Sequence, residues 1–166
     1  MKTIKRQIKK KWHVFYVQAR HEKKVNERLL DCGYETFLPL KKVLKQWSQR
    51  KKWVEEPLFR SYIFVRIKPS ELFKVLEVSG IVTYVRYVGK AATIRQNHID
   101  IIRKLLVSDT TFEVSSDKID VGAEIEIQTG PFRGMKGYVQ QVRGNKKLVV
   151  NLESIDYTVI VELPSA

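Results

Sequence analysis

The sequence predicts an α+β protein, with an antiparallel sheet and flanking helices in its N-terminal part and a small all-β barrel in its C-terminal part. Strand-like and helical patterns alternate up to residue 107. A polar, weakly patterned segment follows, and then short strands separated by glycine turns. We therefore expect a basic arm at 1–11, a first domain at 12–107, a linker at 108–118 and a second domain at 119–166.

The net charge of +13 is distributed unevenly along the 166 residues. Residues 1–107 hold 25 Lys and Arg against 9 Asp and Glu, whereas residues 108–166 hold 6 against 9. This asymmetry indicates two units with different partners, of which the basic one suits nucleic acid. A well-solvated basic surface is the alternative interpretation.

Composition argues against several classes of protein. Apolar residues make up 43% of the chain, which is typical of a globular protein, and no apolar run is long enough for a membrane span. The basic N-terminus lacks a following apolar stretch, so it is not a secretory signal. Cys32 is the only cysteine, which excludes an intrachain disulfide and a cysteine-based zinc cluster. We expect a monomeric cytoplasmic protein.

Nothing in the sequence indicates catalysis, a metal site or a cofactor. The histidines His13, His21 and His98 have no acidic partner at a suggestive spacing. The glycines near residue 130 lack the Gly-Lys-Ser/Thr of a phosphate loop. Cys32 continues the apolar helical series of Val25 and Leu29, so we expect it to be buried. The prediction is a binding protein without catalytic residues.

The first domain is expected to begin with a strand at 12–19 and a helix from His21 that Gly33 ends. A hairpin follows, with an arm at 36–47, a basic turn and a return arm from Trp53. Strands are also expected at 62–67 and 82–88. Between them we expect a helix from Pro69 to Gly80, with Leu72, Phe73 and Leu76 on one side. A last helix is expected from Asn97, and its apolar face consists of Ile101, Ile102, Leu105 and Leu106.

The strand at 62–67 alternates between two kinds of side chain. Ile63, Val65 and Ile67 form an aliphatic face, whereas Tyr62, Phe64 and Arg66 form an aromatic face that ends in a charge. The strand at 12–19 similarly carries Trp12 and Tyr16 on one face. If helices cover one face of the sheet only, these aromatic residues form an exposed patch for a protein partner. If helices cover both faces, they belong to the core.

Residues 130–137 read Gly-Pro-Phe-Arg-Gly-Met-Lys-Gly between two strand-like runs. Three glycines at this spacing indicate positive φ angles or close backbone contacts. The segment resembles the KOW motif of transcription elongation factors and some ribosomal proteins, through Gly130, Phe132, Gly134 and Gly137. With strands at 124–129, 137–142, 147–152 and 157–163, it predicts a small barrel of the SH3-like kind.

Residues 56–65, Glu-Pro-Leu-Phe-Arg-Ser-Tyr-Ile-Phe-Val, resemble a Pro-Leu-Phe-x-x-Tyr-x-Phe-Val segment of the NusG N-terminal domain family. Residues 12–19 resemble the first strand of that family, and the KOW motif follows at the expected distance. The match covers residues 12–163. Within the family, Tyr16 and the Glu-Pro-Leu-Phe segment resemble the corresponding residues of specialised RfaH-type paralogues. The length of the chain is similar to that of UpxY-type antiterminators of polysaccharide operons.

The resemblance implies a transcription elongation and antitermination factor that docks on the clamp helices of RNA polymerase and suppresses pausing and termination. Tyr16, Tyr62 and Phe64 stand at the matching docking positions, and Phe59 and Trp12 are expected to support them. It further implies a nucleoid-associated location and specialisation for certain operons. A housekeeping NusG and an RNA-binding, ribosome-associated KOW protein are the alternatives.

Basic side chains form two groups that the resemblance connects with upstream DNA or the non-template strand. The expected nucleic-acid-binding residues are Arg20, Lys23, Lys24 and Arg28 near the first helix and Lys45, Arg50, Lys51 and Lys52 on the hairpin. Trp47 and Trp53 flank the hairpin tip, where they are candidates for stacking on a base. For the KOW unit, the resemblance implies either a small-subunit ribosomal protein or the termination factor Rho as partner.

Overall fold

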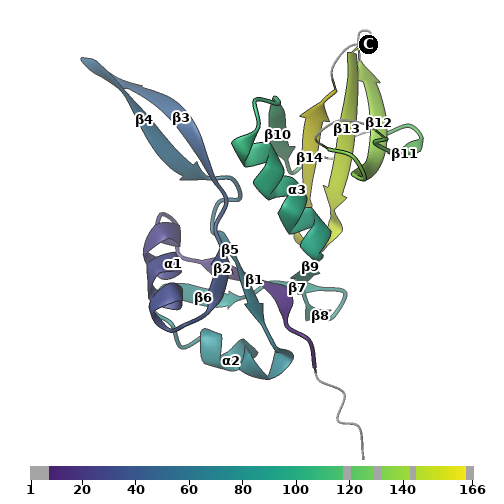
Figure 1. Ribbon diagram of the computed structural model, residues 1–166. Coiled ribbons are helices and arrows are strands. Elements are labelled where there is room, and N and C mark those ends of the chain that lie inside the picture. Colours follow the sequence, from purple (N-terminus) through teal and green to yellow (C-terminus); the bar gives the residue numbers. More distant parts are fainter. Residues whose placement is uncertain (1–7, 118–120, 129–131, 143–144, 164–166) are drawn as a thin grey trace, which may run out of the picture. The chain divides into compact units, whose positions relative to one another are not determined.

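The computed structural model describes residues 8–117, 121–128, 132–142 and 145–163 (Figure 1). The chain divides into two compact units. The first comprises Met1–Leu38 and Arg60–Gln96, and the second comprises Pro39–Phe59 and Asn97–Ala166. Within the described residues, no helix has the length and apolar character that crossing a membrane requires.

The first unit is built on an antiparallel sheet in the order β2-β5-β1-β6, with β9 also pairing with β1. We call it the N-terminal sheet. The central strands are β1 (Lys11–Val17) and β5 (Tyr62–Ile67), as the alternation of the sequence predicted. The other members are β2 (Glu35–Phe37), β6 (Ile81–Tyr84) and β9 (Thr93–Ile94).

Two helices cover one face of the N-terminal sheet. They are α1 (Glu22–Asp31) and α2 (Leu72–Val75), the latter preceded by the 3-10 turn η1 (Pro69–Glu71). The core between sheet and helices consists of Phe15, Val17, Val25, Leu29, Ile63, Val65, Ile67, Leu72 and Val75. The aliphatic face of β5 is therefore a core face, as expected.

The opposite face of the N-terminal sheet is also largely buried. Trp12 is 2% exposed, and Val14 and Phe64 are fully buried. The exposed residues of this face lie at its two ends: Tyr16, 43% exposed, beside half-buried Tyr62, and Arg66, which forms an ion pair with Glu35. Of the two alternatives that the sequence left open, burial therefore holds for the aromatic residues in the middle of this face, and exposure holds for the aromatic residue at the Tyr16 end.

The second unit contains a long two-stranded ribbon and a helix (Figure 1). The ribbon, which we call the hairpin, pairs β3 (Leu40–Trp47) with β4 (Arg50–Pro57). The helix is α3 (Gln96–Val107), whose first residue belongs to the first unit. It buries Ile99, Ile101, Ile102 and Leu105, so its predicted apolar face is correct apart from half-buried Leu106.

The rest of the second unit is an antiparallel sheet in the order β10-β14-β13-β12-β11, which we call the C-terminal sheet. Its strands are β10 (Phe112–Ser115), β11 (Glu124–Glu126), β12 (Lys136–Val142), β13 (Asn145–Leu152) and β14 (Tyr157–Glu162), with the 3-10 turn η2 (Glu153–Ile155) before the last. The predicted α+β class, with a strand-rich C-terminal part, is confirmed.

Strand β10 lies inside the segment that we expected to be a linker, and it pairs with β14. Its apolar members, Phe112 and Val114, alternate with polar residues, but the polar neighbours on both sides conceal this short pattern. The domain boundaries at 107 and 119 remain a prediction.

Three local expectations are wrong. Cys32 is exposed, because it follows the last residue of α1 and no longer continues the buried stripe. Phe73 is 70% exposed, because the short helix turns Leu72 and Val75 towards the core instead. The strand expected at 82–88 is interrupted at Val85, after which β7 (Arg86–Tyr87) and β8 (Lys90–Ala91) form a separate small hairpin.

We predict that Phe64→Ala lowers the free energy of unfolding by about 3–5 kcal/mol, because it leaves a cavity in a fully buried site. Phe73→Ala is the matched control and should cost about 0.5 kcal/mol or less, since that ring is mostly exposed. Urea denaturation followed by circular dichroism measures both changes. Equal losses in the two variants would contradict the assignment of Phe64 to the core.

Burial of His13 is expected to make stability depend on pH. Its ring is 4% exposed, and burial is the main cause that lowers its pKa below the ordinary value of 6.5. The unfolded chain therefore takes up a proton at a higher pH than the folded chain, so this contribution to stability is lost as pH falls through about 6.5. We expect His13→Leu to flatten the decline in melting temperature between about pH 6.5 and 5. An unchanged decline would refute this.

Candidate functional site

Two tyrosines form the exposed aromatic part of the N-terminal sheet. Tyr16 on β1 and Tyr62 on β5 are directly opposite in the antiparallel register. Their ring centroids are 6.2 Å apart, with the planes at 72°, which is an edge-to-face contact. Tyr16 is 43% exposed and Tyr62 is half-buried. We call these residues the tyrosine pair.

The backbone beside the tyrosine pair is held at several points. Ser61 has a positive φ of 63°, and its N–H donates to Oε1 of Glu22 at 3.0 Å. Its carbonyl oxygen accepts from the N–H of Val17 at 2.8 Å. The Glu22 side chain is itself largely buried, at the start of α1. Because β1, β5 and α1 meet in these bonds, the position of Tyr62 relative to Tyr16 is fixed.

Phe64 and Trp12, which the resemblance assigns to polymerase docking and for which the sequence left exposure and burial open, lie in the core. Phe64 packs near Phe37 with ring centroids 6.0 Å apart, and the Trp12 ring lies 6.4 Å from the same residue. The indole N–H of Trp12 donates to Oε1 of Gln96 at 2.6 Å. Of the two alternatives, burial therefore holds for both residues.

Phe59 is also absent from the exposed surface. It is 1% exposed, and its ring makes an edge-to-face contact with Tyr157 at 5.2 Å. Both residues belong to the second unit, whereas the tyrosine pair belongs to the first. The structure therefore does not support Phe59 as part of the same exposed site.

A second exposed aromatic group was missed by the sequence reasoning. The ring of Phe73 lies edge-on to Tyr84 at 6.3 Å, and the guanidinium of Arg86 lies 5.1 Å from the Tyr84 ring centroid. Nη2 of Arg86 also donates to the Tyr84 hydroxyl at 2.9 Å. The spacing of Leu72, Val75 and Leu76 by three and four residues is the signal that leaves Phe73 outside the buried stripe.

The basic residues near α1 remain together in the first unit. Arg20, which has a positive φ of 65°, precedes the helix, and Lys23 and Lys24 are exposed in its first turn. Arg28 is exposed too, but its Nη1 donates to the Ser79 carbonyl oxygen at 2.7 Å. That bond ties α1 to the segment after α2, so Arg28 has a structural role in addition to its charge.

The basic residues of the hairpin belong to the second unit. Arg50, Lys51 and Lys52 are exposed at the start of β4, while Lys45 on β3 forms an ion pair with Glu56. The two groups of cations that the sequence predicted therefore occupy different units. Each group is exposed and carries several positive charges, which is the minimum that phosphate contacts require.

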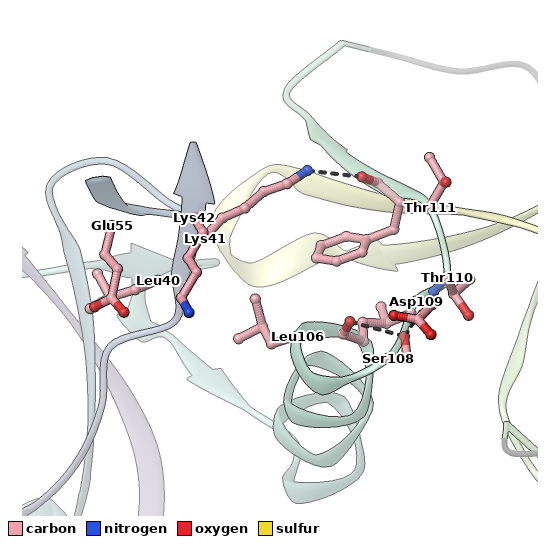
Figure 2. A pocket seen from close by; sticks show the side chains of 11 residues that line it. Leu40, Lys41, Lys42, Glu55, Leu106, Ser108, Asp109, Thr110 and Thr111 are labelled. Atoms are coloured by element: carbon pink, nitrogen blue, oxygen red, sulfur yellow. Dashed lines mark hydrogen bonds between the residues drawn. The ribbon is translucent and has the colours of Figure 1, made fainter. Parts of the chain in front are cut away.

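Lys41, at the base of the hairpin, interacts with Phe112 of the same unit, unlike the exposed cations at the start of β4. Its ammonium donates to the Phe112 carbonyl oxygen at 3.3 Å and lies 5.0 Å from the centroid of that ring. Figure 2 shows this side chain reaching across the pocket lined by Leu106, Ser108 and Thr111 among others. The charge of Lys41 is thus partly satisfied by the protein.

The glycine motif shapes the turn between β11 and β12. Gly134 has a φ of +88°, and its N–H donates to the Ile127 carbonyl oxygen at 2.8 Å. At Gly137 a Cβ atom would lie 2.7 Å from the Val149 carbonyl oxygen, so a side chain is excluded there. Phe132 is half-buried in the turn, and Gly130 lies outside the described residues. The observed constraints explain two of the three glycines.

In the described part of the chain, the potential metal ligands do not cluster, and the buried histidine is bonded to the backbone. There, no three or more His, Cys, Asp and Glu side chains are grouped so that they could hold a metal ion. The buried His13 places Nδ1 3.0 Å from the Lys11 carbonyl oxygen on the same strand, which is a structural bond. What the surface offers is an aromatic pair and two basic groups, and these suit recognition of other macromolecules.

Comparison with known proteins agrees with this picture. The family model described as "Transcription termination factor nusG" matches residues 10–103, which is more than half of the chain. The transcription termination/antitermination protein NusG of Streptococcus pyogenes, in serotypes M1 and M18, is 26% identical over 167 residues and 93% of each chain.

A solved structure has a similar fold along most of its length. It is described as "Domain interaction in Thermotoga maritima NusG" and covers 92% of this chain and 93% of its own, with a TM-score of 0.51 and 20% identity. At that identity the likeness concerns the fold alone. The family model, which spans most of the first unit, carries the assignment: this chain belongs to the NusG family of transcription termination and antitermination proteins.

Proposed function

We propose that this chain is a transcription elongation and antitermination factor that binds the clamp helices of RNA polymerase through the tyrosine pair. The observation that carries the proposal is the exposure of Tyr16, with half-buried Tyr62 beside it, at one end of a sheet face whose other aromatic residues are buried. Membership of the NusG family and the names of the Streptococcus relatives support a role in termination and antitermination.

Tyrosine side chains are well suited to the proposed contact with a protein surface. Each ring contributes a large apolar contact area at low cost in side-chain entropy, and the hydroxyl supplies a hydrogen bond at the edge. The edge-to-face contact and the hydrogen bonds of Ser61 hold the pair in place before a partner arrives. A preorganised aromatic anchor loses little freedom on binding, which favours affinity.

The effect on transcription follows from differential binding. A factor that binds the closed clamp more tightly than the open one increases the population of the closed, elongating state. Pauses and terminators, which depend on the alternative state, are then passed more often. The factor performs no bond chemistry in this mechanism, in keeping with a family of transcription factors rather than enzymes.

Nucleic acid is the second proposed partner, as upstream duplex or as the non-template strand. The exposed cations near α1, Arg20, Lys23 and Lys24, and those of the hairpin, Arg50, Lys51 and Lys52, support this contact. Arg28 and Lys45 are weaker candidates, because a carbonyl oxygen and a carboxylate respectively already engage them. Phosphate contacts of this kind give an affinity that falls with salt.

The C-terminal sheet is proposed to recruit a further protein, either a small-subunit ribosomal protein or Rho. Half-buried Phe132 in the turn and half-buried Ile125 on β11 are the residues suited to line such a site. We further propose that the protein acts as a monomer in the cytoplasm, associated with the nucleoid. The recruitment rests on the family and on the partial exposure of Phe132 and Ile125, and the monomeric state and the location rest on the family.

We propose that the factor is specialised for certain operons, such as polysaccharide clusters, as its likeness to RfaH-type and UpxY-type sequences suggests. A housekeeping NusG is the alternative, and one observation favours it. The curated Streptococcus relatives, which match over 93% of both chains, carry the general name NusG.

Tyr16→Ala and Tyr62→Ala should each weaken binding to RNA polymerase by about 30-fold or more, as expected for central aromatic anchors. The matched control is Tyr87→Ala, because Tyr87 is also 43% exposed but lies on β7. Its affinity should stay within about twofold of the parent chain. Biolayer interferometry with immobilised polymerase measures all three, and circular dichroism verifies folding. Equal effects at Tyr87 and Tyr16 would refute the tyrosine site.

Genome-wide chromatin association distinguishes the specialised factor from a housekeeping one. We expect occupancy confined to a few transcription units, with elongation past terminators lost there when the protein is removed. Occupancy across most transcribed genes would refute specialisation while leaving the polymerase contact intact. Occupancy should disappear in Tyr16→Ala and persist in Tyr87→Ala.

A further inference from the structure

Positive charge in the hairpin is concentrated at its tip. At the base, the register pairs Lys41 with Glu56 and Lys42 with Glu55, so cations and carboxylates balance. Residues 44–53, which we call the hairpin tip, contain no Asp or Glu but four cations: Lys45, Arg50, Lys51 and Lys52. An isolated hairpin needs no such separation for its stability, since opposite charges across the strands would stabilise it better.

The two faces of the hairpin tip differ in chemistry. Residues directly opposite in the register share a face, and neighbours along a strand alternate. One face, the Trp47 face, holds Trp47 opposite Arg50 and Lys45 opposite Lys52. The other, the Trp53 face, holds Trp53 opposite Leu44 and Gln46 opposite Lys51. The structure thus separates two tryptophans that look equivalent in the sequence.

The Trp47 face contains a repulsion that the protein compensates only in part. Lys45 and Lys52 are like charges directly opposite each other, an arrangement that destabilises a strand pair. Glu56 forms an ion pair with Lys45. Among the described residues, neither Lys52 nor Arg50 forms a side-chain hydrogen bond or ion pair. A polyanion lying along this face would therefore replace repulsion by attraction.

Trp47 identifies the kind of polyanion. It is 47% exposed and lies two residues from Lys45, about 7 Å further along the same face. An exposed indole surrounded by cations can stack on a nucleic-acid base, but only where the base is not enclosed in a duplex. Trp53 lies opposite aliphatic Leu44, and Lys51 is the one cation that the hairpin tip places on its face, whereas the Trp47 face carries three. The Trp53 face is therefore less suited to a phosphate chain.

We propose that the Trp47 face of the hairpin tip binds single-stranded nucleic acid, with Trp47 stacking on a base and Lys45, Arg50 and Lys52 contacting phosphates. This inference deepens the nucleic-acid contact of the proposed function and rests on it. It does not involve the tyrosine pair, which lies in the other unit. It assigns the Trp53 face no part in the contact.

The test compares two tryptophan variants of the full chain. Fluorescence anisotropy measures binding to a labelled oligothymidine of about 12 nucleotides, a length within the usual range for single-strand sites. Trp47→Ala should weaken binding by about 5- to 100-fold, the loss expected for one stacked base. Trp53→Ala should stay within about twofold, although Trp53 is the more exposed residue. Trp47→Phe should retain most of the affinity, because its ring also stacks.

Two further measurements separate stacking from charge. Trp47→Ala should leave the salt dependence of binding unchanged, whereas Lys52→Ala should reduce its slope by about 0.7, the value for one phosphate contact on a single strand. Binding to a duplex of the same length should be weaker and insensitive to Trp47→Ala.

Several results would overturn the inference. Equal losses in Trp47→Ala and Trp53→Ala would show that the two faces are not distinct, and an equal effect on duplex would show that stacking is not involved. Competition by polyglutamate as effective as competition by unlabelled oligothymidine would indicate an acidic protein partner. If the parent chain bound neither single strand nor duplex, the nucleic-acid contact of the proposed function would fail as well, while the polymerase contact would still be tested by Tyr16→Ala.

Discussion

The antiparallel pairing of β1 with β5 is the constraint on which the rest of the first unit depends. These strands are central in the sheet, and their register places Tyr16 opposite Tyr62. A slip by one residue would turn each side chain of the slipped strand to the opposite face and would bury the tyrosine in place of an aliphatic residue. Glu22 opposes such a slip, because its buried carboxylate accepts a hydrogen bond from the N–H of Ser61, immediately before β5.

Burial on both faces of this sheet decides which aromatic residues are available to a partner. Phe15 and Phe64 point to opposite faces, and both are fully buried. The exposed aromatic residue lies at the Tyr16 end of the face, so the same strand supplies core residues and the proposed binding residue within a few positions. For this reason, loss of partner binding in a variant of this strand is informative only when its folding has also been measured.

Sequence alone was sufficient for the class of fold and for most elements, because alternation in β5 and helical spacing in α1 and α3 are strong local signals. It failed where burial depends on distant parts of the chain. Phe64 and Tyr62 share one face of one strand, and no local pattern distinguishes the buried ring from the accessible one.

Phe59 and β10 are similar cases, since Tyr157 and β14, which contact them, lie far along the sequence. Trp47 and Trp53 needed the register of the hairpin before their different surroundings became visible.

The proposed polymerase contact and the proposed single-strand contact of the hairpin tip lie in separate units, and this separation has an energetic consequence. Neither contact is large: one is an aromatic pair, and the other is a hairpin tip of 10 residues, 44–53. Because one chain carries both, binding at the first site raises the effective concentration of the second, so two modest affinities combine into a strong one. The nucleic-acid term is sensitive to salt and the aromatic term is much less so. A factor built in this way binds the transcribing complex, which offers polymerase and exposed nucleic acid together, in preference to either component alone.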